Sequence, residues 1–366
     1  MALDRDAERV AWVDLAKGMC IILVVMMHAT LSTGVAMKGE GFMHAVVAFA
    51  RPFRMPDFFL LSGLFLARVI DRDWRRYADT RVVHFAYFYV LWLLIHSILK
   101  AGEVSGGTTL GLLRHLATSL AEPYSSLWFI HMLAVFSVVT KLLRRLPASA
   151  LLALAAALEI LPIQAGSHLI NEFCGRWIYF LIGYRFAPQI FAFAAGAAAR
   201  PVPALLGLGA WVLLNGVFAF TPHAGGGKLA DLPVLSFALG LAGSGAVIAV
   251  AALLARATAE IRSGAARAAI GALRLCGARS IAIYLCFFLP MAATRLTIVE
   301  TGAIGDVGLA SLVVTAAAVI VPLLLDRVVR GTPFAFLFTR PAWAHLPPAR
   351  GSGGRPAAVS ALHPAE

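Results

Sequence analysis

The first apolar segment of this 366-residue chain contains side chains that can do chemistry. It runs from Trp12 to Thr30, close to the length of a membrane-spanning helix, about 20 residues, yet it includes Asp14, Lys17 and His28. On a helix, Lys17 and His28 lie on nearly one face, about 16 Å apart, and Asp14 can pair with Lys17. Ionisable groups at such positions are costly and usually functional. We therefore take these three residues as catalytic candidates; interfacial anchoring is the alternative.

The chemistry that suits this pattern is group transfer near one side of a membrane. An uncharged imidazole can take a proton from a hydroxyl, or it can carry an acyl group itself. The sequence leaves both roles open for His28. Lys17 is too far away to touch a group that reacts there, so we expect it to act on access of a substrate or through Asp14.

The composition indicates the elements that hold these residues. The chain is 60% hydrophobic and only 14% charged, with a mean hydropathy of +0.82, which is outside the range of soluble domains. The sequence thus predicts an all-α, polytopic integral membrane protein. About ten transmembrane helices are expected, near residues 11–30, 44–67, 84–99, 127–143, 148–163, 173–193, 202–220, 232–255, 280–298 and 307–329.

Basic residues predict the orientation. The net charge of +12 comes from short basic runs between apolar segments, a pattern typical of the positive-inside rule and not of nucleic-acid binding. The connections after the second, fourth, sixth and eighth segments contain most of these residues, which places both termini in the cytoplasm. They are Arg68, Arg72, Arg75, Arg76, Arg81, Lys141, Arg144, Arg145, Arg200, Arg256, Arg262, Arg267, Arg274 and Arg279, against Lys38, Lys100, Arg114 and Lys228 in the alternate connections.

Two further features concern domains and metals. Residues 1–330 are expected to form the membrane domain, and residues 331–366 a cytoplasmic tail that is disordered from about residue 347. The arginine-rich connection between Arg256 and Arg279 is helix-like. The four cysteines have no metal-ligand or disulfide spacing, so no metal site is predicted.

Several motifs together resemble the membrane-bound acyltransferase-3 family, which includes O-antigen, nodulation-factor and glucan O-acylases. The first span is similar in having a basic residue, ten intervening positions and a histidine, here Lys17 and His28. Three later stretches are also similar: PFRMPDFFLLSGLFLA from Pro52 to Ala67, SLWFIHMLAVF from Ser126 to Phe136, and SIAIYL from Ser280 to Leu285.

The resemblance implies an inner-membrane O-acyltransferase. It would move an acyl group, acetyl being expected, from cytoplasmic acyl-CoA to a hydroxyl of a carbohydrate or lipid-linked glycan at the outer face. Acyl-CoA would be a donor substrate, with no tightly bound cofactor, and membrane lipids would surround the protein. The acyl chain, the acceptor and the oligomeric state are left open by the sequence.

The resemblance also suggests binding residues. Members often have R-x-x-R before the third span, where this chain has Arg81-Val-Val-His84, and Arg72-Asp-Trp-Arg75 offers the same spacing earlier. Either set can hold the CoA phosphates. On the acceptor side, candidates are the two arginines of the second span, which can bind a sugar or an oxyanion, and two aromatic rings that can stack on a sugar. These are Arg54, Arg51, Trp128 and Tyr284.

Two alternatives remain. Asp14, Lys17, Arg54 and Arg176 could line the aqueous path of a transporter or flippase, which has no reason to bind acyl-CoA. A non-catalytic family member is the other, because Cys286, Phe287 and Phe288 follow the SIAIYL stretch where members often have a histidine.

Overall fold

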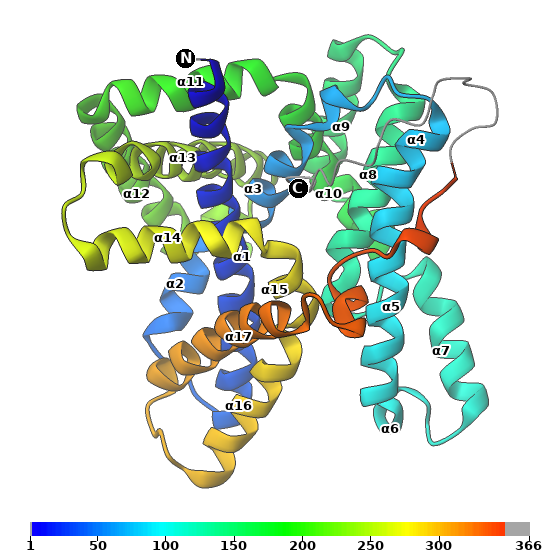
Figure 1. Cartoon of the computed structure of the whole chain (residues 1–366). Helices are drawn as coiled ribbons and strands as arrows, with labels where there is room; N and C mark the ends of the chain where they lie inside the picture. The colour runs from blue at the N-terminus through cyan, green and yellow to red at the C-terminus, as the bar shows by residue number, and fades with distance from the viewer. Residues whose placement is uncertain (1, 348–366) are drawn as a thin grey trace.

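The computed structural model describes residues 2–347, where the regular elements are helices, apart from an isolated β-bridge between Pro222 and Lys228. In Figure 1 the helices around α1 form the left-hand side of the view, and α5, α7 and α8 form the right-hand side. The elements are α1 (Ala2–Met37), α2 (Phe42–Ala50), α3 (Arg54–Gly63), η1 (Leu66–Arg68), α4 (Trp74–Ala78), η2 (Asp79–Val83), α5 (His84–Leu99), α6 (Ala101–Val104), α7 (Thr109–Ala121), η3 (Ser125–Leu127), α8 (Trp128–Leu143), α9 (Ala148–Ile160), α10 (His168–Arg185), α11 (Ala187–Ala199), α12 (Pro201–Phe220), η4 (Leu229–Asp231), α13 (Pro233–Glu260), α14 (Gly264–Ala278), α15 (Ser280–Cys286), α16 (Phe288–Thr301), α17 (Val307–Val329), η5 (Pro333–Leu337) and η6 (Ala342–Ala344).

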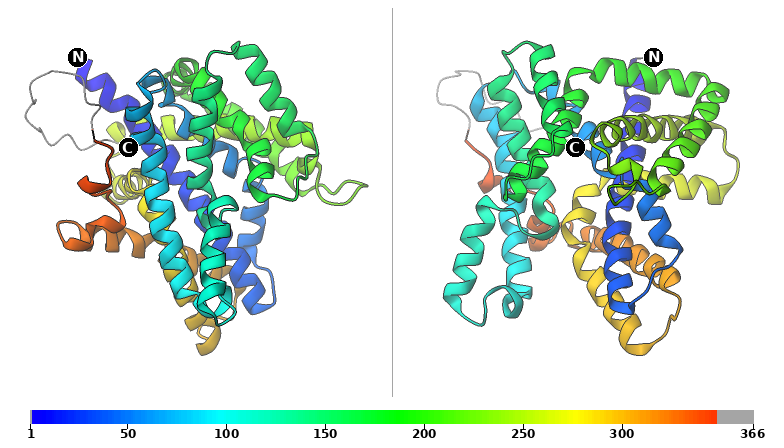
Figure 2. Two further views of the ribbon diagram at one scale, coloured as in Figure 1. Left: turned by 90° about the vertical axis from the view of Figure 1, so that its right-hand side faces the viewer. Right: turned by 180° about the vertical axis from the view of Figure 1, so that it is seen from behind.

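The long helix α1 is the centre of the left-hand group. It contacts α3, α13, α14, α15 and α17, and Figure 2 shows its C-terminal half in front when the molecule is seen from behind. Glycines allow the approach of α14. A Cβ atom on Gly277 would lie 1.7 Å from the carbonyl oxygen of Asp14, and one on Gly18 would lie 2.2 Å from that of Leu273. The helix expected in the arginine-rich connection is therefore present, and it packs directly on α1.

A second close contact joins α3 to α10. A Cβ atom on Gly63 would lie 2.2 Å from the carbonyl oxygen of Phe180, and one on Gly183 would lie 2.0 Å from that of Leu60. Small residues at a helix interface let two membrane helices approach to backbone contact. The contact holds α3 and α10 side by side, so that residues earlier on both helices can face one space.

Within residues 2–347, six helices are long and apolar enough to cross a membrane, or up to eight if each of two bent helix pairs is one span. The chain is thus an all-α polytopic membrane protein, as predicted. The count of ten spans and the cytoplasmic position of both termini remain predictions. The six are Ala11–Met37, Trp74–Leu99, Thr109–Leu143, Pro201–Phe220, Pro233–Thr258 and Val307–Val329, and the bent pairs are His168–Arg185 with Ala187–Ala199 (77°) and Gly264–Ala278 with Ser280–Cys286 (70°).

Prolines account for two differences between the expected spans and the observed helices. The segment expected at 44–67 is divided into α2 and α3, because Pro52 has no N–H to donate to the carbonyl of Ala48, which accepts from the N–H of Arg51 instead. The segment expected at 280–298 is divided at Phe287. There Pro290 cannot donate to the carbonyl of Cys286, four residues earlier.

The connection between α3 and α5 is fixed to α8. The Tyr77 hydroxyl donates to the Ser137 carbonyl at 2.7 Å. The ammonium of Lys141 donates to the carbonyls of Ile70 at 2.6 Å and Arg72 at 2.7 Å. These bonds satisfy buried polar groups of one element with partners from another. They hold the backbone of the connection that contains Arg72 and Arg75 against α8.

The described part of the C-terminal tail lies against η2 and α5. The Trp92 indole donates to the carbonyl of Leu337 at 3.0 Å, and the Arg340 guanidinium donates to the carboxylate of Asp79 at 2.8 Å. Figure 1 shows this orange-red segment reaching α5. The disorder predicted from about residue 347 falls outside the described residues, and the domain boundary at residue 330 remains a prediction.

Candidate active site

A cavity of about 190 Å³, here called the His28 cavity, lies where α1, α3, α8, α10 and α15 meet. Four residues predicted to act in catalysis or acceptor binding line it together: His28, Arg54, Trp128 and Tyr284. They come from four elements that are far apart in the chain. The remaining lining residues are Val24, Met27, Met55, Phe58, Ser126, Phe129, Glu172 and Arg176.

His28 faces the cavity from α1, and its ring is half-buried. Its ring centroid lies 5.3 Å from that of Phe287, with 35° between the ring planes. Phe287 belongs to the short break between α15 and α16, so the proline-induced interruption of that segment supplies one wall for the imidazole. An imidazole packed on an aromatic ring at one side, with the cavity on another, is positioned to act on a group bound there.

Arg54, the first residue of α3, lines the same cavity and brings a positive charge to it. Its Nε and Nη1 atoms are buried and have no hydrogen-bond partner among the described residues. Burying two guanidinium nitrogens without a partner is costly, and their N–H groups suit a negatively charged oxygen. Arg54 can therefore hold an anionic group of a substrate or an oxyanion that forms next to His28.

The two aromatic candidates contribute in different ways. The hydroxyl of Tyr284 donates to the carbonyl of Ser126 and accepts from the backbone N–H of Phe129 at 3.1 Å. These bonds connect α15 to the start of α8, so the hydroxyl is occupied and the residue acts in positioning. Trp128 is half-buried, and its ring meets that of His168 edge-on with centroids 5.8 Å apart. Both rings border the cavity, and stacking on a sugar remains a prediction for them.

Asp14 and Lys17 do not line the His28 cavity. The carboxylate of Asp14 lies 3.8 Å from Nε of Arg274 on α14, and the ammonium of Lys17 lies 6.0 Å from the ring centroid of Phe65. The pairing of Asp14 with α14 supports the close packing at α1. A catalytic role for Asp14 and Lys17 remains a prediction, and from these positions it would be exerted at a distance from His28.

Arg51 lies outside the His28 cavity, on the surface. Its side chain is 64% exposed, and its Nη2 atom pairs with the carboxylate of Asp231 at 3.1 Å. The role of Arg51 in acceptor binding remains a prediction, and from this position it would be exerted through Asp231.

The four candidates for the CoA phosphates lie around α4, η2 and the start of α5. Arg72 and Arg75 are exposed, whereas Arg81 and His84 are partly buried. None of them lines the His28 cavity. The structure thus separates the predicted donor-phosphate residues from the predicted reaction centre, and the choice between the two pairs stays open.

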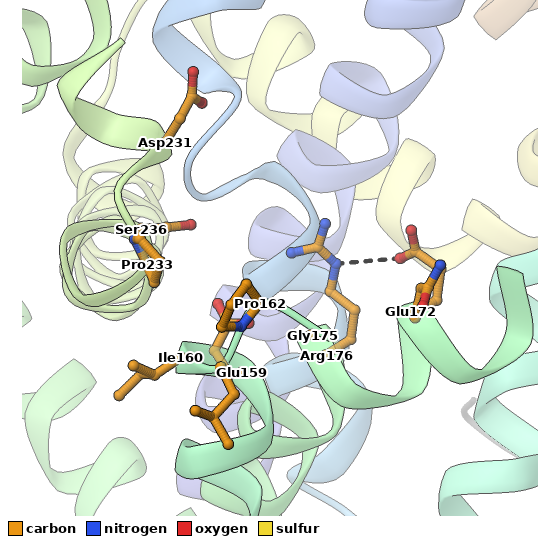
Figure 3. A pocket seen from close by; sticks show the side chains of 11 residues that line it. Glu159, Ile160, Pro162, Glu172, Gly175, Arg176, Asp231, Pro233 and Ser236 are labelled. Carbon is orange, nitrogen blue, oxygen red and sulfur yellow. Dashed lines mark hydrogen bonds and ion pairs between the residues drawn. The ribbon is translucent and has the colours of Figure 1, made fainter. Parts of the chain in front are cut away.

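Two cavity residues on α10 were not assigned to the site from the sequence, although Arg176 was considered for a transport path. The carboxylate of Glu172 and Nε of Arg176 lie 3.4 Å apart, one helical turn from each other, as Figure 3 shows. A charged pair four residues apart in an apolar segment was the signal that could have identified them, because such residues face the protein interior in membrane helices.

Comparisons with known proteins point in one direction. The sequence pattern of the family described as "Acyltransferase domain" (acyltransferase-3) matches residues 10–327. The inner membrane protein YcfT of Escherichia coli K12 is 26% identical over an alignment of 169 residues that covers 38% of this chain and 45% of that protein, so the chain spans less than half of YcfT. No solved structure matches the chain.

Proposed function

Since this chain belongs to the acyltransferase-3 family, we propose that it is an inner-membrane O-acyltransferase that uses acyl-CoA as donor. Membership of the family indicates acyltransferase activity in a multi-pass membrane protein. The inner membrane is supported by the similarity to YcfT. The acceptor in this proposal is a hydroxyl of a carbohydrate or lipid-linked glycan at the outer face.

The observation that carries the proposal is the meeting of His28 and Arg54 in one cavity. In the general-base route, His28 takes the proton of the acceptor hydroxyl as its oxygen attacks the thioester carbonyl. The Arg54 guanidinium stabilises the resulting oxyanion. The carbon–sulfur bond then breaks, the thiolate recovers the proton from the imidazolium, and the ester and free CoA remain.

The acyl-carrier route uses the same two residues. The imidazole nitrogen attacks the thioester and releases CoA as the thiol, and the acceptor hydroxyl then takes the acyl group from the imidazole. In both routes the apolar walls formed by Phe58, Phe129 and Phe287 limit the access of water, which would otherwise hydrolyse the donor.

The size of the cavity favours a short acyl group. Its volume of about 190 Å³ is below the roughly 300–1,000 Å³ of sites for drug-sized ligands. Acetyl transfer from acetyl-CoA fits this space, whereas a long chain does not. The CoA moiety would then lie outside the cavity, with its phosphates at the arginines of the connection between α3 and α5.

A transporter is less well supported. That function requires Asp14, Lys17, Arg54 and Arg176 to line one path, and the His28 cavity contains only the last two of them. Binding of acetyl-CoA by the purified protein separates the two functions.

The test compares His28→Ala with His131→Ala, a matched control. Both rings are half-buried, and each packs on an aromatic ring. The centroids are 5.3 Å apart for His28 and Phe287 and 5.0 Å apart for His131 and Tyr89. Of the two, His28 lines the cavity. We expect His28→Ala to abolish transfer to the acceptor in membranes while acetyl-CoA binding persists. His131→Ala should retain transfer.

Near-normal transfer by a monodisperse His28→Ala protein would overturn the assignment. Absence of acetyl-CoA binding by the wild-type protein would overturn the proposed donor. Binding of acetyl-CoA without transfer by the wild type, over a panel of acceptors, would identify a non-catalytic member of the family.

A further inference from the structure

A second cavity, of about 230 Å³, adjoins the His28 cavity and is here called the carboxylate pocket. It lies between the end of α9, the middle of α10, η4 and the start of α13. Figure 3 shows Arg176 with Glu172 on one side and Glu159 and Asp231 on the other. Glu172 and Arg176 line both cavities. A ligand in the carboxylate pocket would therefore lie next to the space that His28 faces.

The lining is rich in hydrogen-bond acceptors. It contains the carboxylates of Glu159, Glu172 and Asp231, and Arg176 is its basic residue. Glu172 is paired with Arg176 at 3.4 Å, and Asp231 with the exposed Arg51 at 3.1 Å. The three carboxylates are thus balanced by only two guanidiniums, those of Arg176 and Arg51, and Arg176 also attracts Glu159.

Glu159 is the residue that marks the pocket as a binding site. It lies near the end of α9, whose sequence ASALLALAAALEI is otherwise apolar or small, and a lone carboxylate in such a helix is expected to be functional. Its Oε1 atom accepts a hydrogen bond from Tyr179 at 3.0 Å, and among the described residues it forms no ion pair. Oε2 faces Gly175, where a Cβ atom would lie 3.6 Å away. The missing side chain at Gly175 keeps space open in front of this oxygen.

Two neutral polar side chains complete the lining. Asn171 uses its Oδ1 atom to accept from the Ala165 N–H at 2.9 Å, which leaves its amide N–H groups to donate. Ser236 presents a hydroxyl at the start of α13, as Figure 3 shows. The pocket thus offers mostly acceptors with a few donors, the complement of a group with several hydroxyls.

We propose that the carboxylate pocket holds the acyl acceptor, a single sugar-sized group that bears hydroxyls and no negative charge. This rests on the proposed O-acyltransferase function. Ionised carboxylates only accept hydrogen bonds, so hydroxyl donors suit them, whereas an anionic sugar meets a like charge at Glu159. The volume admits one ring of a glycan, and the shared Glu172–Arg176 wall places a hydroxyl of that ring beside the His28 cavity.

The experiment uses the full chain purified in detergent and two probes that differ in one carboxylate, methyl β-D-glucopyranoside and methyl β-D-glucuronide. Binding is measured by saturation-transfer NMR, and acetyl-CoA binding by calorimetry on the same samples. The variants are Gly175→Leu, which fills the space before Glu159, and Glu159→Gln, which removes the charge but keeps an acceptor for Tyr179. Gly207→Leu is the control, because Gly207 on α12 is exposed with open space around it.

We expect the wild type to bind the glucoside at least about tenfold more tightly than the glucuronide, a difference of about 1.4 kcal/mol. Gly175→Leu should lose glucoside binding, Gly207→Leu should keep it, and Glu159→Gln should remove the discrimination. Equal binding of both probes, no glucoside binding, or an unchanged preference in Glu159→Gln would overturn the proposal. If Gly175→Leu does not fold, the preference measured for Glu159→Gln tests the proposal.

The acetyl-CoA measurement separates this inference from the proposed function. If the wild type binds acetyl-CoA but the glucoside results fail, the acceptor assignment is wrong and the O-acyltransferase proposal stands. If acetyl-CoA is not bound, the donor chemistry itself is wrong.

Discussion

Replacing Arg54 tests whether a buried cation stabilises the negative charge that develops beside His28. Arg54 presents two buried nitrogens, Nε and Nη1, that have no hydrogen-bond partner among the described residues. Loss of one oxyanion donor costs about 10²–10³ in kcat, or about 2.7–4 kcal/mol. We therefore expect Arg54→Met to lower kcat by at least about 10², with KM for acetyl-CoA little changed, because the contact is made in the transition state.

The stability of the same variant should move the other way. Two guanidinium nitrogens of Arg54 are buried without a hydrogen-bond partner among the described residues, and an apolar side chain of similar length removes that desolvation cost. We expect the Tm of Arg54→Met to be equal to or above that of the wild type. Arg54→Lys should give an intermediate kcat, because it keeps the charge but lacks the planar fork of donors.

Arg185→Met is the matched control. Arg185 also lies on a helix, is partly buried and has an unpartnered Nε atom, but it does not line the His28 cavity. The assay is the release of CoA thiol during acetyl transfer at saturating acetyl-CoA, with thermal unfolding followed in detergent. A kcat within about tenfold of wild type for Arg54→Met would refute the reasoning. So would an equal loss in Arg185→Met.

Three further predictions concern the donor site, the topology and the packing. Arg75→Ala and Arg81→Ala should weaken acetyl-CoA binding in calorimetry by about ten- to a hundredfold, the value of a charge-assisted contact of about 1.5–3 kcal/mol, and unchanged affinity in both would move the phosphate site elsewhere. A cysteine placed at Ala78 should not react with a membrane-impermeant thiol reagent in intact cells, because the connection that contains it is predicted to be cytoplasmic. The four native cysteines are buried and should give little background labelling. Labelling at position 78 would reverse the predicted orientation. Gly63→Ala should lower the Tm and the yield of monodisperse protein, because its Cβ atom would lie 2.2 Å from the carbonyl oxygen of Phe180, and a wild-type Tm would contradict the close packing of α3 on α10.

The sequence identified the residues of the His28 cavity that belong to its recognisable motifs. His28 and Arg54 stood out because ionisable side chains in apolar segments are rare and costly. Helical periodicity put Lys17 and His28 on nearly one face, and composition alone required a polytopic membrane protein. The resemblance added Trp128 and Tyr284, and all four cavity residues are indeed brought together.

Other features depended on contacts between elements. The sequence did not indicate that the Tyr284 hydroxyl is taken by the Ser126 carbonyl, or that Phe287 packs on His28. Nor did it separate Arg51, which pairs at the surface with Asp231, from Arg54, which faces the cavity three residues later. Arg51 follows the last residue of α2 and Arg54 is the first residue of α3, so the break at Pro52 places their side chains in different surroundings.

The sequence by itself therefore determined the class of protein, its helical character and the ionisable residues within each apolar segment. The partners of each helix were decided by the tertiary structure. Apolar segments are nearly alike in composition, so hydropathy contains no information on which of them pack together, whereas close approach at small residues such as Gly63 and Gly183 selects the pairs. That selection brings Glu172 and Arg176 of α10 to the cavity of His28 on α1, and it places Glu159 beside them in the carboxylate pocket.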